Sequence, residues 1–139
     1  KGARGVDGRE YPWGGTSWLD GWDATRCRNR WNGYDEKQST ADVFAFPRGR
    51  SPWGLYGMAG NVSEWTADHY DANAYLRYST GDYSPPPHSG TRAVRGGAWG
   101  YGAEYDYRCS RRKAGPASSS SVVGFRCAMD PPSDQAQGR

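Results

Sequence analysis

The chain of 139 residues contains three Leu, six Val and no Ile, so it has few of the residues that fill most protein cores. Its bulk is aromatic instead: seven Trp and ten Tyr, each of which can bury roughly 150–250 Å². Three Leu cannot supply the apolar stripes of a helical bundle, and no run of about 20 apolar residues could span a membrane. The Val/Ile/Leu runs of a parallel α/β sheet are also absent. We therefore expect a loop-rich domain with an aromatic core, whose backbone turns at many of its 20 Gly and 9 Pro.

The charges are nearly balanced, with 18 basic and 15 acidic residues and a formal net charge of +3 at pH 7. The one dense basic run consists of Arg108, Arg111, Arg112 and Lys113. Nucleic-acid-binding proteins normally carry a broader basic stripe, so we interpret this run as a solvated loop or as partners of internal ion pairs. Nucleic acid is therefore not among the expected partners.

The three cysteines, Cys27, Cys109 and Cys127, cannot all pair within the chain. A Cys109–Cys127 bridge would close a loop across the Ser-rich segment and contribute about 3 kcal/mol, but the sequence does not decide whether it forms. The cysteine spacings match no zinc motif. His69 and His88 stand apart in the sequence, which is typical of surface or packing histidines.

Short strands separated by turns are expected along the chain. Asp71 can cap a helix over residues 72–78, and the Gly96-Gly97 pair allows a close backbone approach between two strand pieces. Tyr101, Tyr105 and Tyr107 lie at even offsets, which predicts that they share one face of an extended strand. The other predicted strands cover residues 41–47, 62–67, 93–99 and 122–128.

Several short sequence blocks follow one another between residues 4 and 128. They are Arg4-Gly5, Tyr11-Pro12-Trp13-Gly14, Gly54-Leu55-Tyr56, the run from Gly60 to Thr66, the run from Arg95 to Trp99, and Gly124-Phe125-Arg126. Together they resemble the C-terminal portion of the formylglycine-generating enzyme family, also called the sulfatase-modifying factor or FGE-sulfatase family. The resemblance implies an α+β fold of the C-type-lectin-like kind, loop-rich with short strands. It assigns residues 1–130 to the C-terminal part of one such domain, and residues 131–139 are expected to be a disordered tail.

The family domain is considerably longer than this chain, and its N-terminal half packs against the C-terminal strands. We therefore expect another chain or fragment to supply that half, which would make this chain a subunit of a complex. A self-sufficient monomer of residues 1–139 with a closed core would contradict this expectation.

Members of the family oxidise a substrate cysteine with two active-site cysteines that bind copper(I), a metal for which thiolates are suitable ligands. The corresponding interval here, from Trp99 to Arg108, contains no cysteine, and Glu104 falls near one of the two catalytic positions. Neither copper nor formylglycine generation is therefore expected. Cys109 and Cys127 resemble structural cysteines of the family; the usual partner position of Cys109 corresponds to Ala3, which leaves Cys27 as a candidate disulfide partner.

The resemblance also implies two calcium sites, because loop carboxylates, amides and carbonyls suit this hard cation. The first would use side chains and carbonyls of Asn29, Arg30, Asp35 and Lys37. The second would use Gly60, Val62 and Glu64, with Gly57 standing where a side-chain ligand normally lies. The alternative is that Asp35 and Glu64 cap turns or pair with Arg.

In a C-type-lectin-like fold, loops corresponding to residues 99–121 form an exposed surface over a rigid base. We therefore interpret the chain as a non-catalytic ligand-binding, protein-binding or scaffold module, with a protein or a carbohydrate as ligand. Tyr, Trp and Arg are typical of interface anchors. The candidate ligand-binding residues are Trp99, Tyr101, Glu104, Tyr105, Asp106, Tyr107, Arg111 and Arg112.

Two alternatives stay open. The chain could be an enzyme of the same family with altered chemistry, in which Glu104, Asp106 or tyrosines of the former active site do acid–base work. It could also be the hypervariable ligand-binding protein of a diversity-generating retroelement. The altered cysteines and the calcium loops favour an extracytoplasmic location, either periplasmic or secreted.

Overall fold

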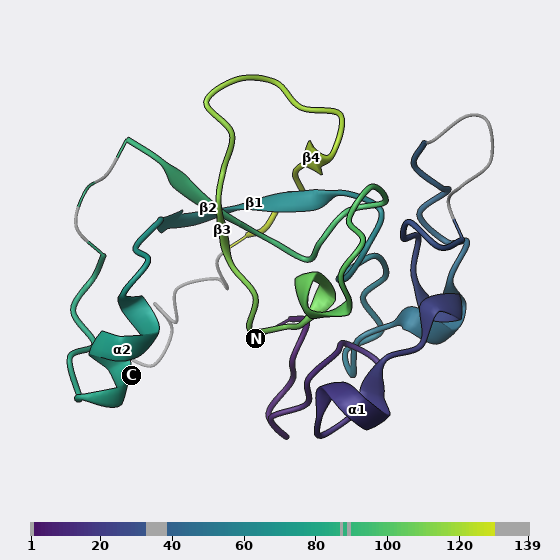
Figure 1. Cartoon of the computed structure of the whole chain (residues 1–139), viewed down its shortest axis with the longest axis horizontal. Helices are drawn as coiled ribbons and strands as arrows, with labels where there is room; N and C mark the ends of the chain where they lie inside the picture. The colour runs from purple at the N-terminus through teal and green to yellow at the C-terminus, as the bar shows by residue number, and fades with distance from the viewer. Residues whose placement is uncertain (1, 33–38, 87, 89, 130–139) are drawn as a thin grey trace, which may run out of the picture.

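A small mixed sheet lies at the centre of the computed structural model, which describes residues 2–32, 39–86, 88 and 90–129 (Figure 1). Within these residues the strand order is β3-β2-β1-β4. The strand β1 pairs antiparallel with β2 and parallel with β4, and β2 pairs antiparallel with β3. The strands are β1 (Ser63–His69), β2 (Arg92–Arg95), β3 (Lys113–Ala114) and β4 (Val123–Gly124).

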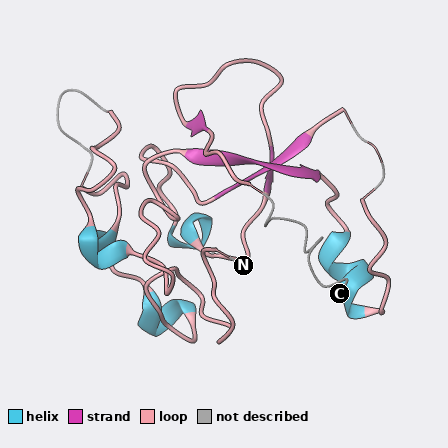
Figure 2. Cartoon of the chain, turned by 180° about the vertical axis from the view of Figure 1, so that it is seen from behind, coloured by secondary structure: helices cyan, strands magenta, loops and turns pink. Residues whose placement is uncertain are grey.

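The α-helices are short, with α2 at the lower left and α1 at the bottom of Figure 1, and Figure 2 shows that loops connect nearly all elements. The combination of a small mixed sheet with short helices is an α+β architecture. The α-helices are α1 (Trp18–Gly21) and α2 (Ala74–Ser79), and the 3-10 helices are η1 (Ala24–Arg26), η2 (Pro47–Gly49) and η3 (Glu104–Tyr107).

Several predicted elements are confirmed with shifted bounds. The strands β1, β2 and β4 fall within or next to the predicted segments, although β4 covers only two residues. The predicted helix is α2, which starts two residues late because Asp71 forms a turn before it: its carboxylate accepts from the Asn73 N–H (2.8 Å) and its carbonyl from the Ala74 N–H (3.3 Å).

Two strand predictions are wrong. The segment 41–47 turns at Asp42, whose carboxylate accepts from the Phe44 N–H (2.8 Å) and whose carbonyl accepts from the Ala45 N–H (3.1 Å). These bonds replace the sheet ladder with a local turn. Residues 104–107 form the 3-10 helix η3 instead of an extended strand, so Tyr105 and Tyr107 do not share a face: Tyr107 is buried and Tyr105 is exposed.

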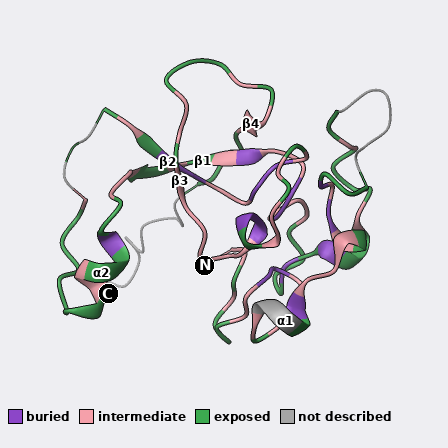
Figure 3. Ribbon diagram, in the orientation of Figure 1, coloured by how far each residue is buried: buried purple, intermediate pink, exposed green. Residues whose placement is uncertain are grey.

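The core is aromatic, as predicted, and it lies between the N-terminal loops and η3 (Figure 3). Trp22 is its hub, with ring centroids 5.5 Å from Tyr11, 6.1 Å from Trp13 and 4.9 Å from Tyr107. Tyr11 and Trp13 stack on each other at 5.5 Å. Large aromatic rings thus bury the area that aliphatic side chains bury in most domains.

The Gly96-Gly97 pair permits the close approach expected of it. Gly97 has a φ of 72°, and a Cβ atom at this position would lie 2.8 Å from the ring of Tyr107. No second strand follows, because the chain turns at Trp99 and Gly100. The pair therefore places η3 tightly against the end of β2.

Several large apolar side chains remain exposed, among them Phe44 (69%), Trp53 (59%) and Phe125 (77%). Exposed apolar side chains of this size are expected where another chain or fragment covers the surface. The chain or fragment that would supply the N-terminal half of the domain stays a prediction. Among the described residues, no helix is long and apolar enough to cross a membrane. The predicted tail, residues 131–139, lies outside the described residues, and the extracytoplasmic location stays a prediction.

Candidate ligand-binding cleft

An open cleft of about 340 Å³ lies where the segment after η3 meets the segment before and within α2. This volume falls within the roughly 300–1,000 Å³ range of small-molecule sites. One wall belongs to residues 70–75 and the other to residues 105–112. The lining residues are Tyr70, Ala72, Tyr75, Tyr105, Arg108, Ser110, Arg111 and Arg112.

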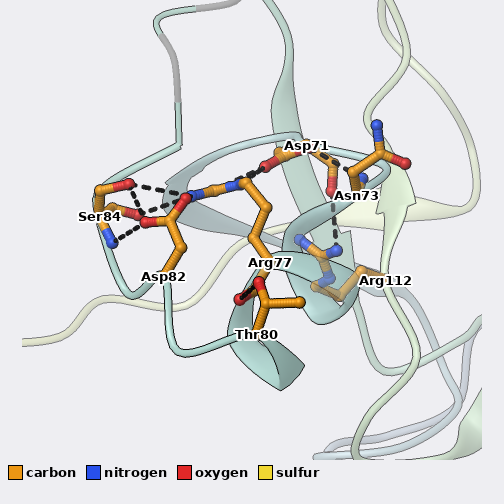
Figure 4. Close-up of polar contacts among 7 residues, drawn as sticks. All are labelled: Asp71, Asn73, Arg77, Thr80, Asp82, Ser84 and Arg112. Carbon is orange, nitrogen blue, oxygen red and sulfur yellow. Dashed lines mark hydrogen bonds and ion pairs between the residues drawn. The ribbon is translucent and has the colours of Figure 1, made fainter.

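Arg112 joins the two walls. Its guanidinium lies over the rings of Tyr75 (4.4 Å) and Tyr70 (5.8 Å). Its Nη2 donates to the Asp71 carbonyl (2.8 Å), a bond drawn in Figure 4. The hydroxyl of Tyr75 reaches back to donate to the Ser110 carbonyl. These contacts bridge residues that are distant in the sequence, so the shape of the cleft is a tertiary feature.

The α2 wall is held by Arg77 (Figure 4). Its Nη2 and Nε bind the Asp71 carboxylate at 2.7 and 2.9 Å, and its Nη1 binds Asp82 (3.1 Å) and the Ser84 hydroxyl (3.1 Å). The hydrogen bond from Arg77 lowers the pKa of Asp71, and the Ser84 hydroxyl lowers the pKa of Asp82 to about 2. Both carboxylates are therefore ionised at neutral pH. Their bonds to Arg77 hold the segments before and after α2 against the helix.

The opposite wall carries excess positive charge. Asp106 is buried and forms ion pairs with both Lys113 (2.9 Å) and Arg111 (3.3 Å), so one carboxylate serves two cations. Arg108 pairs with Glu10 (2.9 Å). Arg111 also lies over the ring of Tyr105, at 5.1 Å from its centroid. The predicted interpretation of the basic run as partners of internal ion pairs is thus confirmed for Arg108, Arg111 and Lys113.

The structure brings Tyr105, Arg111 and Arg112 of the predicted surface to the cleft and leaves the other five candidates out of its lining. Tyr107 and Asp106 are buried, and Tyr101 packs on the core. Trp99 and Glu104 are half-buried, and the Trp99 ring N–H donates to the Ser121 carbonyl (3.2 Å).

Five further residues line the cleft without having been predicted from the sequence: Tyr70, Ala72, Tyr75, Arg108 and Ser110. The one available signal was the tyrosine-rich run around the predicted helix, where Tyr70, Tyr75 and Tyr78 flank or occupy the helical segment.

None of the three cysteines is in a disulfide, so the predicted pairings do not form within this chain. The physical reason is their placement: Cys27 is buried in the aromatic core, Cys109 is half-buried after η3, and Cys127 is exposed beyond β4. Burial raises the pKa of Cys27 to about 12 and that of Cys109 to about 11. These two thiols are therefore protonated at neutral pH, which makes them poor nucleophiles.

The first predicted calcium set is only partly visible, because Asp35 and Lys37 lie outside the described residues. The Asn29 side chain is buried, and its Oδ1 accepts from the backbone N–H groups of Trp31 (2.9 Å) and Asn32 (3.2 Å). Its Oδ1 is thus engaged in building the turn, and calcium at this set stays a prediction.

In the second set, the carboxylate of Glu64 is bound by the guanidinium of Arg126. Arg126 binds the Glu64 carboxylate through two bonds of 2.6 Å and donates to the carbonyls of Tyr56 (3.1 Å) and Gly57 (3.2 Å). With no side-chain oxygen at position 57, these residues do not fit a calcium ion unless Arg126 leaves Glu64. The alternative interpretation of Glu64, as a partner of an arginine, is the arrangement observed.

His69 and His88, far apart in sequence, lie with ring centroids 4.6 Å apart, which agrees with the interpretation of them as surface or packing histidines. No group of three or more His, Cys, Asp or Glu that could hold a metal occurs among the described residues.

Comparison with known proteins gives a consistent result. The sulfatase-modifying factor enzyme 1-like domain family matches residues 1–131. The chain is 38% identical to a formylglycine-generating enzyme of Thermomonospora curvata, over 91% of this chain and 45% of that protein. It is 31% identical to the inactive C-alpha-formylglycine-generating enzyme 2 of Bos taurus, over 89% of this chain and 38% of that protein. The chain thus spans less than half the length of these relatives.

Solved structures agree with the predicted fold. PvdO from Pseudomonas aeruginosa matches with a TM-score of 0.63 and 25% identity, over 89% of this chain and 46% of that one. The Treponema denticola variable protein 1 matches with a TM-score of 0.62 and 26% identity, over 89% of this chain and 41% of that one. These similarities confirm the predicted α+β fold of the formylglycine-generating-enzyme type.

Proposed function

This chain belongs to the sulfatase-modifying factor enzyme 1-like family, and we propose that it is a non-catalytic ligand-binding module of that family. The observation that carries the proposal is the open cleft of about 340 Å³ lined by tyrosines and arginines. One of its walls belongs to the segment for which the sequence predicts a binding surface. Tyr and Arg are the residue types that most often anchor ligands and partners.

The chemistry of the thiols supports the non-catalytic part of the proposal. The interval from Trp99 to Arg108 contains no cysteine, and Cys109, the nearest one, has a pKa raised to about 11 by burial. A protonated thiol is a poor nucleophile for exchange with a substrate cysteine. One relative is itself named as an inactive formylglycine-generating enzyme.

Two measurements test the proposal. Oxygen consumption and aldehyde formation are followed with a cysteine-containing peptide and copper, where we expect no turnover; turnover would overturn the non-catalytic assignment. Amide NMR shifts are then recorded against a fragment library. We expect the shifts to concentrate at residues 70–75 and 105–112, and fragments that bind only elsewhere would contradict the role of the cleft.

A second candidate is a hypervariable ligand-binding protein, favoured by the structural similarity to the Treponema denticola variable protein 1. In that case near-identical copies of the chain would differ mainly within residues 99–121. Sequencing the locus for an adjacent near-repeat of this segment tests the idea, and substitutions spread evenly over the chain would exclude it.

A further inference from the structure

We propose that the cleft is an oxyanion site centred on Arg112, and that its ligand carries a phosphate, sulfate or carboxylate group on a ring. This inference rests on the proposed function as a binding module and adds the chemical class of the ligand. The charge, the aromatic surface and the rigidity of the cleft support it.

The charge of Arg112 is not met by a carboxylate hydrogen bond among the described residues. Its Nη2 donates to a backbone carbonyl, and its Nε is buried with no hydrogen-bond partner there. The nearby carboxylate of Asp71 is bound by the Nη2 and Nε of Arg77 at 2.7 and 2.9 Å. Arg112 therefore brings a cation to the cleft whose fork of N–H donors suits a planar or tetrahedral oxyanion.

Arg111 adds to this potential. It shares the single carboxylate of Asp106 with Lys113, so these three residues together keep a positive charge beside Arg112. Two arginines that line one cleft attract an anion more strongly than a single isolated surface charge does.

The tyrosines supply the second part of the recognition. Tyr75 is 46% exposed and Tyr105 is 49% exposed, and both line the cleft. Exposed tyrosine rings are typical stacking platforms for sugar or aromatic rings. The cleft volume of about 340 Å³ accommodates a ring together with one anionic group.

The site is also held in shape before any ligand arrives. The Arg77 bonds to Asp71 and Asp82 fix one wall, and the Arg112 bond to the Asp71 carbonyl ties the other wall to it (Figure 4). A preformed site loses less conformational entropy on binding.

The test uses phenyl phosphate as the probe, titrated calorimetrically and by amide NMR at low ionic strength. We expect it to bind at residues 105–112 and to bind about tenfold more tightly than inorganic phosphate, which lacks the ring. Phenyl β-glucoside, which has the ring without the charge, should bind more weakly than phenyl phosphate, and added salt should weaken the phosphate binding.

Variants then separate the roles. Arg112→Met should lower the affinity for phenyl phosphate about tenfold or more, and Arg112→Lys should give an intermediate loss because a lysine keeps the charge but not the fork. The matched control is Arg50→Met, since Arg50 also lies over a tyrosine ring (Tyr56, 5.6 Å) but outside the cleft. It should leave the affinity unchanged. Thermal melts establish whether each variant is folded. If Arg112→Met does not fold, Arg112→Lys serves as the test.

The outcomes separate the two proposals. Equal losses for the Arg112 and Arg50 variants, or phenyl β-glucoside binding as tightly as phenyl phosphate, would overturn the oxyanion site while leaving a binding module intact. Turnover of a thiol peptide would overturn the proposed function itself, whatever the anion affinity.

Discussion

The aromatic core and the cleft are built from the same residue types and use them in opposite ways. In the core, Tyr11 and Tyr107 are completely buried and pack on Trp22. The Tyr107 hydroxyl lies 2.9 and 2.6 Å from the carbonyl oxygens of Ala98 and Tyr101, so its one proton can be donated to either of them. In the cleft, Tyr75 and Tyr105 stay about half exposed and contact arginines.

The difference shows what decides where a tyrosine goes in a chain with little Leu and no Ile. A ring packed on other rings can be buried completely, as Tyr11 and Tyr107 are. A ring that supports a guanidinium stays near water, because burying the cation would cost more than the contact gains. The presence of an arginine over the ring therefore distinguishes the exposed tyrosines of the cleft from the buried tyrosines of the core.

The largest effect is expected for Tyr107→Ala. The change leaves a cavity beside Trp22 and removes the hydroxyl that lies against the Ala98 and Tyr101 carbonyls, so the free energy of unfolding should fall by about 4 kcal/mol. Urea denaturation followed by tryptophan fluorescence measures it. Tyr107→Phe, which keeps the ring, should lose only about 1 kcal/mol. Equal losses for the two variants would mean that the hydroxyl, not the packing, stabilises the core.

An intermediate decrease in the free energy of unfolding is expected at alkaline pH, because the thiol of Cys27 in the core then titrates. Burial raises the pKa of this thiol from 9.0 to about 12, so the folded state holds the proton that the unfolded state loses. The corresponding stability is complete below pH 9 and is lost as the pH rises towards 12, by about 1 kcal/mol at pH 10.

The measurement is the urea midpoint between neutral pH and pH 10, compared with that of Cys27→Ala. The variant should have a shallower pH dependence even if its stability at neutral pH is lower. Parallel curves for the two proteins would show that Cys27 does not titrate differently on folding.

Much of the core and of the sheet follows from the sequence, because those features are local or compositional. The shortage of aliphatic residues predicts an aromatic core, and the pattern of residues 62–67 predicts β1. The Gly96-Gly97 pair predicts a close backbone approach, and Tyr107 packs against Gly97 there. The family blocks locate the same elements in order.

The cleft could not be predicted in the same way, because its walls come from separate parts of the chain. Arg112 binds the Asp71 carbonyl across 41 positions of sequence. The alternation of Tyr105 and Tyr107 suits a strand as well as a 3-10 turn, and only the packing of Tyr107 under Gly97 decides between them. The sequence thus identifies one wall of the site and is silent about the other.

The smallest effect on stability is expected for Tyr105→Ala, which removes a half-exposed ring and its contact with Arg111. The free energy of unfolding should change by about 0.5 kcal/mol or less, since exposed contacts between a cation and a ring contribute little. The affinity for phenyl phosphate should nevertheless fall several-fold, because a stacking platform is lost. Tyr105→Phe, measured by the same urea and calorimetric titrations, should preserve both quantities. A loss of stability as large as that of Tyr107→Ala would place Tyr105 in the core and remove the distinction between the two regions.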